Sequence, residues 1–392
     1  MKILYSGHPF WFTAFRPFFL LASLQFALFL ILWVFNYTQF LRLEVLHSGL
    51  VWHMHEMIFG FARAVIIGFL FTAAQNWTGK KLLNGRMLQL FVILWISGRT
   101  AFFIPGFLIY LALAADTVLN FTAVYLLVKF LFTPGQKHNR IIALLFAYFS
   151  AVQLIVQAAL LNYLVPEKII HLMHMGLLVV VLYVMIIAGR VVPFFTGVVL
   201  PEAGTRRVDL LEKNIMWLSL PIPILELSEV GAFAGGWIAA GYLILLAGLH
   251  AIRWFFWHPW KTLSKPILFI LHISYLWVPV SLVAYALFML KIATPGIVWH
   301  SFGLGVIAMF ILGMMTRVSL GHTGRPIVAS KNVMLAYFLL GSAVLIRVSV
   351  SFWSNVNFGY LVSGVLASIA FLIFFIEYVP VLVSARPDGK QI

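Results

Sequence analysis

The sequence predicts an all-α membrane protein in which about twelve transmembrane helices form a single domain, residues 1–392. Three observations support this fold class. Of the 392 residues, 63% are hydrophobic and only 9% are charged, and the mean hydropathy of +1.04 is far above that of soluble domains. The apolar segments are about twenty residues long, which suits a helix that crosses a bilayer and is twice the length of a barrel strand. Lysine and arginine also gather on alternate loops.

The apolar segments follow one another at short intervals. The first begins after Arg16 and is long enough to cross the bilayer by itself, so no cleavable signal peptide is expected. The seventh is the weakest, because it is short and contains Pro221 and Pro223. The twelve predicted helices cover residues 17–37, 50–78, 87–105, 107–129, 140–163, 168–190, 214–228, 232–255, 266–290, 297–318, 331–353 and 358–380.

The distribution of cations predicts the orientation of these helices. Twenty of the 26 Lys and Arg residues fall on one set of alternate loops, three fall on the other set, and three lie inside predicted helices. Because short cytoplasmic loops are enriched in Lys and Arg, both termini are expected in the cytoplasm. The same loops account for the formal charge of +15, so the expected environment is a lipid bilayer and no nucleic-acid partner is expected.

The sequence contains no cysteine. This excludes disulfides, zinc–thiolate sites, iron–sulfur clusters, covalent haem attachment at CxxCH and cysteine nucleophiles. Any bound metal must therefore be held by histidine, methionine or oxygen ligands.

Three segments of the sequence resemble one another: HMHEMIFGFARAVIIGFLFTAAQNWTG (53–79), HLMHMGLLVVVLYVMIIAGRVVPFFTG (171–197) and HSFGLGVIAMFILGMMTRVSLGHTG (300–324). Each begins with histidine, continues as an apolar helix that contains glycine, and closes with Thr-Gly. They fall on the second, sixth and tenth predicted helices, which suggests three repeats of four helices, about 1–135, 136–257 and 258–392. The alternative is chance similarity, since small residues at helical spacing are common in membrane helices.

Five histidines stand at the start of these three helices: His53, His55, His171, His174 and His300. Helices that enter the membrane in the same direction bring these rings to one depth in the outer leaflet, where imidazole can bind copper, iron or zinc. His171 and His174 share a helix face and can chelate one ion. His53 and His55 point about 200° apart, so they can serve two adjacent sites. For any single histidine the alternative is an interhelical hydrogen bond.

Charged residues also lie inside the predicted helices. Glu56 is a candidate to accept a hydrogen bond from a metal-bound imidazole or to carry a proton, and its alternative role is an ion pair with Arg63. Arg99 and Arg347 can each hold a haem propionate through a bidentate pair. The alternative for these arginines is a buried pair with Asp116 or with a backbone carbonyl.

The segments HPFWFTAFRPFF, WHMHEM…NWTG, HLMHMG, GRVVPFFTG and GHTGR resemble the NnrS family of bacterial twelve-helix proteins, over nearly the whole chain. The resemblance implies a protein of the bacterial cytoplasmic (inner) membrane that contains haem and copper and protects cells against nitric oxide. It does not imply turnover of a substrate. If the protein is an enzyme, it is expected to be a metal-dependent oxidoreductase that acts on nitric oxide or a related small molecule.

A more distant likeness is architectural. Subunit I of the haem–copper oxidases also has twelve helices in three groups of four, with metal ligands in the outer half of helices that include the second, sixth and tenth. Those oxidases use a histidine of the seventh helix for copper, and the seventh predicted helix here has none. The likeness therefore concerns the fold, and fold alone does not carry function.

These observations lead to one specific hypothesis for the metal sites. His300 and one of His53 or His55 are expected to ligate haem iron, while the remaining histidine of that pair forms a copper or second haem site with His171 and His174. Two other functions stay open. A secondary transporter would use the intramembrane charges as substrate or proton sites, and a non-catalytic partner of another metal enzyme would bind cofactors without turnover.

Overall fold

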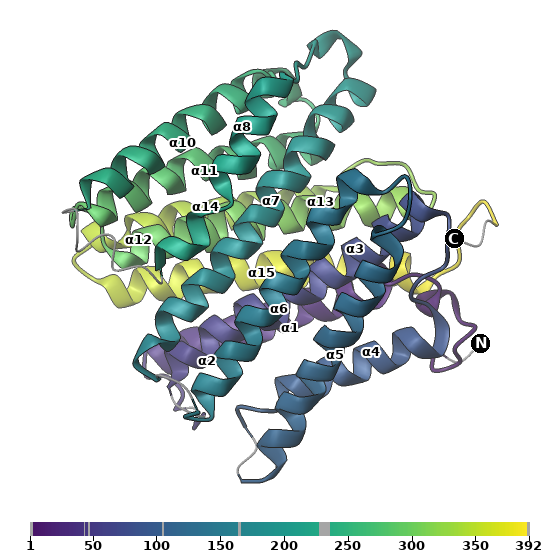
Figure 1. The fold of residues 1–392 in the computed structure, drawn as a ribbon, viewed down its shortest axis with the longest axis horizontal. Coiled ribbons are helices and arrows are strands. Elements are labelled where there is room, and N and C mark those ends of the chain that lie inside the picture. The colour runs from purple at the N-terminus through teal and green to yellow at the C-terminus, as the bar shows by residue number, and fades with distance from the viewer. Residues whose placement is uncertain are drawn as a thin grey trace. The chain divides into compact units, whose positions relative to one another are not determined.

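The computed structural model describes residues 3–42, 44–45, 48–103, 106–163, 166–226 and 236–389, and all regular elements within these ranges are helices (Figure 1). Ten of the described helices are long and apolar enough to cross a membrane. The predicted fold class, an all-α polytopic membrane protein, is therefore confirmed. The count of twelve helices and the three repeats are not confirmed.

Seven of the ten helices carry a single label in Figure 1: α1 (Phe15–Tyr37), α5 (Leu108–Leu131), α6 (Arg140–Leu160), α7 (Ile169–Val199), α10 (Trp237–Phe255), α11 (Pro266–Met289) and α15 (Val356–Val383). An eighth, α14 (Lys331–Ser349), continues through a 3-10 turn to Phe352. The other two are built from three consecutive pieces. These are α2 (Gly49–His55), η2 (Glu56–Ala62) and α3 (Arg63–Thr78), and α12 (Pro295–His300), η8 (Ser301–Ala308) and α13 (Met309–His322).

The third predicted helix corresponds to α4 (Gly85–Arg99). Although α4 has only 15 residues, it runs antiparallel to the helix of residues 49–78. Near its start, Gln89 donates to the Leu4 carbonyl at 2.8 Å, and further along Trp95 Nε1 donates to the Gly60 carbonyl at 3.1 Å. At its end, Arg99 NH1 lies 3.3 Å from Glu56 Oε2. Between Trp95 and Arg99, α4 therefore lies against residues 56–60 and runs in the opposite direction.

The seventh predicted helix is divided in the structure. The α-helix α8 covers Asp209–Ser219, and a 3-10 helix, η6, follows at Ile222–Glu226. Pro221 and Pro223 lack the backbone N–H that a continuous helix needs, so the α-helical pattern stops before them. The last part of the predicted segment, residues 227–228, lies outside the described residues.

Helix ends follow local sequence signals. Ser48 caps the helix that begins at Gly49 and accepts a hydrogen bond from Val51 N at 3.3 Å. The Thr-Gly pairs at 78–79 and 323–324 end helices, because Gly79 and Gly324 adopt left-handed conformations with φ of 67° and 68°. The third pair does not, since α7 continues past Gly197 to Val199.

Two helices contain π-helical segments, and both segments begin immediately after a candidate metal ligand. The segment η2 follows His55, and η8 follows His300. π-Helical turns are rare and are concentrated at functional sites. The second and tenth predicted helices therefore share a structural feature that their sequences did not reveal, whereas α7 is α-helical throughout.

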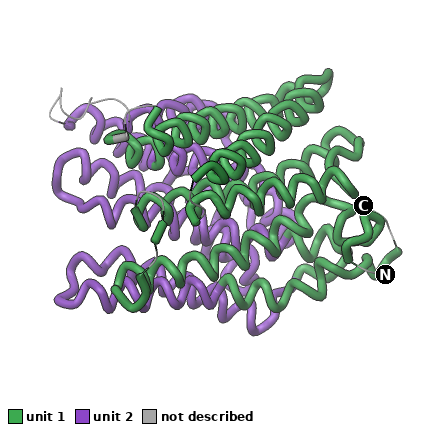
Figure 2. The backbone as a smooth tube through the Cα atoms, turned by 90° about the horizontal axis from the view of Figure 1, so that it is seen from below, with its two compact units in different colours: residues 1–173, 318–327, 371–392 green, residues 174–317, 328–370 purple. Residues whose placement is uncertain are grey.

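The contacts within the chain define two compact units (Figure 2). Unit 1 comprises residues 1–173, 318–327 and 371–392, and unit 2 comprises residues 174–317 and 328–370. In unit 1, Arg16 at the start of α1 donates to the carbonyls of Leu382 and Ser384 at 2.9 and 2.7 Å. The two ends of the chain therefore lie at the same end of unit 1. In unit 2, α10 packs along α11.

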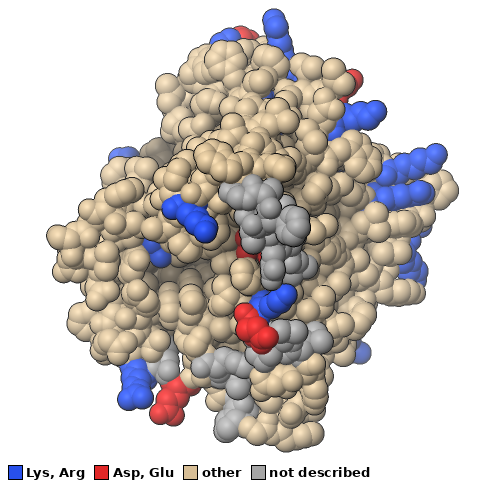
Figure 3. Space-filling view, turned by 60° about the vertical axis from the view of Figure 1, so that its left-hand side comes forward, with Lys and Arg blue, Asp and Glu red and all other residues tan. Residues whose placement is uncertain are grey.

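Much of the surface is apolar. On the face drawn in Figure 3, most of the surface is uncharged. Large apolar side chains are exposed on the helix surfaces, including Phe121, Phe338, Leu345 and Ile376, each more than 60% exposed. Such surfaces would associate in water and are expected in lipid.

Candidate functional site

In unit 1, His55 belongs to a buried cluster of charged and amide side chains. His55 and Glu56 are fully buried, and Nδ1 of His55 lies 3.0 Å from Oε1 of Glu56. Glu56 is held on its other oxygen, because Oε2 accepts from Gln25 Nε2 at 3.1 Å and lies 3.3 Å from Arg99 NH1. The carboxylate is therefore fixed by three neighbours.

Asp116 joins two arginines in the same cluster. Its Oδ1 accepts from Arg63 NH2 at 2.7 Å and its Oδ2 accepts from Arg99 NH2 at 2.6 Å. Gln153 adds a hydrogen bond to Asp116 Oδ2 at 3.0 Å and accepts one from Arg63 NH1 at 2.9 Å. The positive charges of Arg63 and Arg99 are therefore balanced by the negative charges of Asp116 and Glu56. Charged groups are tolerated in a buried site only when they are paired in this way.

The cluster decides between the roles expected for its members. Arg99 forms the buried pair with Asp116, which is the alternative to a haem propionate contact, and it also contacts Glu56. Arg63 pairs with Asp116 and not with Glu56. The alternative role considered for Glu56, an ion pair with Arg63, is therefore not the pairing seen here, and Arg99 lies beside Glu56 instead.

Glycine provides the space for these charges. A Cβ atom at Gly60 would meet Arg99 NH1, Gln25 Nε2 and Glu56 Oε2, and a Cβ atom at Gly98 would overlap the Asp116 carboxylate. Glycine at these two positions therefore allows close packing of charged side chains.

In unit 2, His174 of α7 forms a second polar site. Its Nδ1 lies 3.3 Å from Oε2 of Glu226, and Tyr285 of α11 donates its hydroxyl to Oε1 of Glu226 at 2.7 Å. The ring of His174 stacks on Trp299, with centroids 3.7 Å apart and an interplanar angle of 14°. These contacts fix both the plane and the orientation of the imidazole.

His171 lies one turn before His174 on the unbroken helix α7. The ligand atoms of His171, His174 and Glu226 all lie within 4.8 Å of one another. Two imidazoles and one carboxylate form a donor set that suits copper, iron or zinc. Glu226 thus stands beside the predicted pair of α7, either as a third ligand or as the acceptor that holds Nδ1 of His174.

His300 follows Trp299 in unit 2. Its Nδ1 lies 3.0 Å from the carbonyl oxygen of Gly296, one turn earlier. Arg347 lies close to this turn, since a Cβ atom at Gly296 would be 3.6 Å from its NH1, and its guanidinium lies 4.2 Å from the ring centroid of Tyr360.

His55, His174 and His300 share one feature of hydrogen bonding. In each, Nδ1 faces an oxygen that can only accept: the carboxylate of Glu56, the carboxylate of Glu226 or the carbonyl of Gly296. Nδ1 must therefore carry the hydrogen, and Nε2 carries the lone pair that a metal would use. In His55 this Nε2 is buried and has no hydrogen-bond partner.

The other buried histidines of unit 2 differ. Nε2 of His250 lies 3.3 Å from Ser219 Oγ, while its Nδ1 lies 2.6 Å from the Tyr275 hydroxyl. Nε2 of His272 lies 2.9 Å from Thr196 Oγ1. Hydrogen bonds to hydroxyls account for both rings.

His53 has a different environment from His55. It is partly buried, and its ring stacks on Trp33 with centroids 4.9 Å apart and an interplanar angle of 10°. The two histidines therefore have different neighbours, as their separation around the helix predicted. The side chains that sequence reasoning missed are Gln25, Gln153, Glu226 and Tyr285, which become important only through contacts with distant parts of the chain.

Comparison with known proteins identifies the family. The family model described as NnrS protein matches residues 9–386. The chain belongs to the NnrS family. No curated protein matches the chain.

Membership of the NnrS family supports a membrane protein associated with the response to nitric oxide. The residues of this NnrS protein fit the two cofactors that the resemblance implies. The orphaned, buried Nε2 of His55 could hold a haem iron, and the imidazoles of His171 and His174 could hold copper, with Glu226 beside them.

Proposed function

We propose that this NnrS-family protein binds haem and copper in the bacterial cytoplasmic membrane and protects the cell against nitric oxide. The observation that carries the proposal is the shared orientation of His55, His174 and His300, each with Nδ1 held by an oxygen acceptor. Outer hydrogen bonds of this kind are found on most metal-binding histidines, because they fix the ring and the tautomer.

The proposal assigns the two cofactors to different histidines. His55 is the proposed haem ligand of unit 1 and His300 that of unit 2, and each stands directly before a π-helical segment. His55 is preferred to His53 as the haem ligand, because its ring is fully buried and its Nε2 has no hydrogen-bond partner. His171 and His174 are the proposed copper ligands, with Glu226 beside them. Ferrous haem and cuprous copper would supply the sites at which nitric oxide binds.

The surrounding side chains of the protein hold these histidines in place. Glu56 orients the ring of His55, and Arg99 and Gln25 hold Glu56. Glu226 orients His174, while the Tyr285 hydroxyl satisfies the second oxygen of that carboxylate. Burial of these groups excludes water, which strengthens each electrostatic contact.

In this proposal the chain crosses the membrane twelve times. Two of the crossings are short: α4 forms one, and α8 together with η6 forms the other. Both termini are then cytoplasmic, in agreement with the excess of Lys and Arg on one set of loops. The adjacent ends of α1 and α15 in unit 1 support termini on one side.

The test is the absorption spectrum and metal content of the protein purified from membranes. A Soret band that shifts on addition of nitric oxide, together with bound copper, is expected. His55→Ala and His300→Ala should each lower haem occupancy, whereas His322→Ala should not, since His322 packs against Phe15 at a centroid distance of 5.7 Å outside the proposed sites. Folded wild-type protein without a Soret band and without copper would overturn the proposal.

A further inference from the structure

Trp52 of α2 carries a buried N–H group that no acceptor satisfies. Its side chain is fully buried, and Nε1 has no hydrogen-bond partner among the residues that the structure describes. Other tryptophans show the usual arrangement, in which the indole donates to a backbone carbonyl: Trp11 to Ile3, Trp95 to Gly60 and Trp254 to His272. Burial of an N–H group without an acceptor is unfavourable. The indole of Trp52 is therefore able to donate to a ligand.

The same helix carries an orphaned acceptor one turn later, Nε2 of His55. Because α2 is α-helical from Gly49 to His55, residues three positions apart, such as Trp52 and His55, lie on one face. The ring contacts agree. Trp52 packs edge-on against Phe103 with centroids 5.7 Å apart, and His55 lies 4.8 Å from the ring centroid of Phe102. The orphaned donor and the orphaned acceptor therefore border the same part of unit 1.

Trp52 lies nearer than His55 to the exposed end of this helix. The helix begins at Gly49, directly after the exposed Ser48, so Trp52 stands in its first turn. The propionates are the anionic groups of a haem, and anionic groups favour the polar end of a membrane helix over its apolar middle. The carboxylates of a haem held by His55 are therefore expected on the side of Trp52.

Arg99 is a poorer partner for a propionate than Trp52. Its NH2 donates to Asp116 at 2.6 Å, and its NH1 lies 3.3 Å from Oε2 of Glu56. The charges of this cluster already balance, so a further carboxylate there would be uncompensated. Glu56 also follows His55 along the helix, whereas Trp52 precedes it.

We propose that the indole N–H of Trp52 donates a hydrogen bond to one propionate of the haem held by His55. This inference rests on the proposed function, because it requires haem at His55. A hydrogen bond to a charged acceptor is stronger than one between neutral groups, and more so where water is excluded. With the iron held by His55 and one propionate held by Trp52, the haem can no longer rotate about its bond to the imidazole.

Haem titration of the full-length protein, prepared without haem, tests the proposal. Trp52→Phe keeps an aromatic ring and removes the N–H, so we expect it to lower haem affinity roughly tenfold or more. The titration is repeated with haem dimethyl ester, in which both propionates are blocked. The difference between wild type and variant should then shrink to less than about threefold, because a neutral ester oxygen is a weaker acceptor than a carboxylate.

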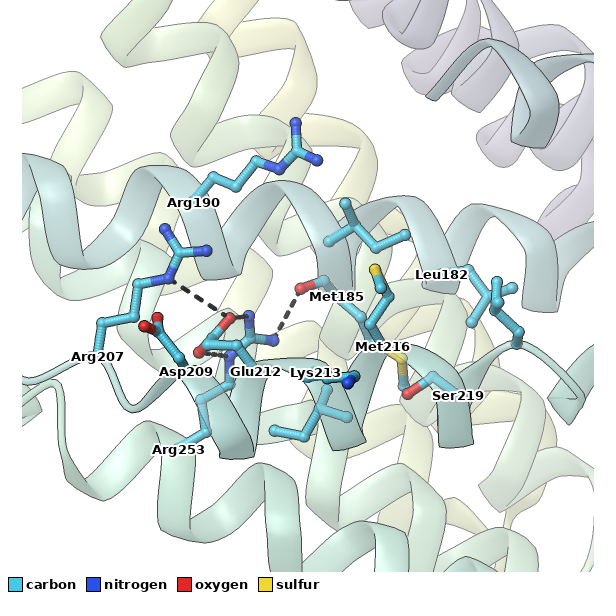
Figure 4. Close-up of a pocket in the computed structure, with 13 residues that line it drawn as sticks. Leu182, Met185, Arg190, Arg207, Asp209, Glu212, Lys213, Met216, Ser219 and Arg253 are labelled. Atoms are coloured by element: carbon cyan, nitrogen blue, oxygen red, sulfur yellow. Dashed lines mark hydrogen bonds and ion pairs between the residues drawn. The ribbon is translucent and has the colours of Figure 1, made fainter. Parts of the chain in front are cut away.

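Trp257→Phe is the matched control. Trp257 belongs to unit 2 and is also fully buried with an orphaned Nε1. The guanidinium of Arg253 lies 5.3 Å from its ring centroid. Arg253 lines a cavity of about 250 Å³, where it pairs with Glu212 and donates to the Met185 carbonyl (Figure 4). Since the described residues that line this cavity include no proposed metal ligand, the control should bind haem and its ester as the wild type does.

The opposite results decide against the proposal. Unchanged haem affinity in Trp52→Phe would show that the N–H is not used, and an equal loss for haem and its ester, or in Trp257→Phe, would assign Trp52 to packing alone. If Trp52→Phe does not fold, equal affinity of the wild type for haem and the ester would overturn the proposal. A wild type that binds no haem at all would overturn the proposed function as well, whereas the other results leave that function intact.

Discussion

Glu56 Oε1 lies 3.0 Å from Nδ1 of His55, and both side chains are fully buried. Glu56 belongs to the π-helical segment that starts after His55, so the two neighbours in sequence are also neighbours in space. The carboxylate fixes the tautomer of His55 and leaves the lone pair on its buried Nε2, which has no hydrogen-bond partner. This relationship makes Glu56 a positioning residue for the proposed haem.

Replacement of Glu56 by glutamine tests that role. Glu56→Gln keeps an acceptor near His55 but removes the negative charge, so haem affinity should fall about 10–100-fold and the reduction potential should rise. Haem titration and a redox titration measure the two effects. The matched control is Glu202→Gln, an exposed carboxylate after α7. An unchanged potential with normal haem content would contradict the positioning role.

Loss of Asp116 should destabilise unit 1 strongly. Asp116→Asn leaves Arg63 and Arg99 with only one carboxylate between them, and breaking a buried ion pair costs about 3–5 kcal/mol. Thermal unfolding in detergent measures the change. Asp388→Asn removes the exposed partner of Arg386 and should cost no more than about 1 kcal/mol. An equal loss of stability in the two variants would show that the buried ion pairs of Asp116 stabilise the protein no more than an exposed pair does.

Changes at His174 or Glu226, in the proposed copper site, should lower the copper content of the protein without lowering its haem content. His174→Ala removes a proposed ligand, and Glu226→Gln weakens the orientation of the ring, for which an affinity loss of about 10–100-fold is expected. Copper content and the Soret band are measured on the same sample. His138→Ala, in the turn before α6, serves as the control. Copper at the wild-type level in His174→Ala would exclude this site.

The glycine beside Asp116 should tolerate no side chain. In Gly98→Ala the new Cβ atom overlaps the Asp116 carboxylate, and overpacking of this kind costs about 1–3 kcal/mol. Gly341→Ala is the comparison, because nothing lies within 4 Å of a Cβ atom at that helical position. The difference in unfolding temperature gives the result, and equal temperatures would mean that the carboxylate can move aside.

The sequence was sufficient to place most of the helices. The predicted segments 50–78 and 266–290 differ from the observed Gly49–Thr78 and Pro266–Met289 by one residue at most at each end, because apolar length and flanking polar residues determine where such helices begin and end. Pro221 and Pro223 also marked the segment in which α8 ends and a 3-10 helix, η6, follows.

The partners of the charged residues could not be predicted in the same way. Arg63 was expected on the face of Glu56, seven residues earlier, which assumes α-helical periodicity. The π-helical segment between them changes that periodicity, and Arg63 meets Asp116 instead. Glu226 meets His174 across 52 residues of sequence, and one sequence contains no signal for such a contact.

The segments η2 and η8 also affect how relatives should be compared. A π-helical turn has one residue more than the α-helical turn it replaces, so it represents an insertion inside a membrane helix. In an alignment of this chain with a relative that lacks the turn, the correct gap falls within residues 56–62 or 301–308. An ungapped alignment would match His55 and Arg63, or His300 and the residues after η8, to positions on different helix faces.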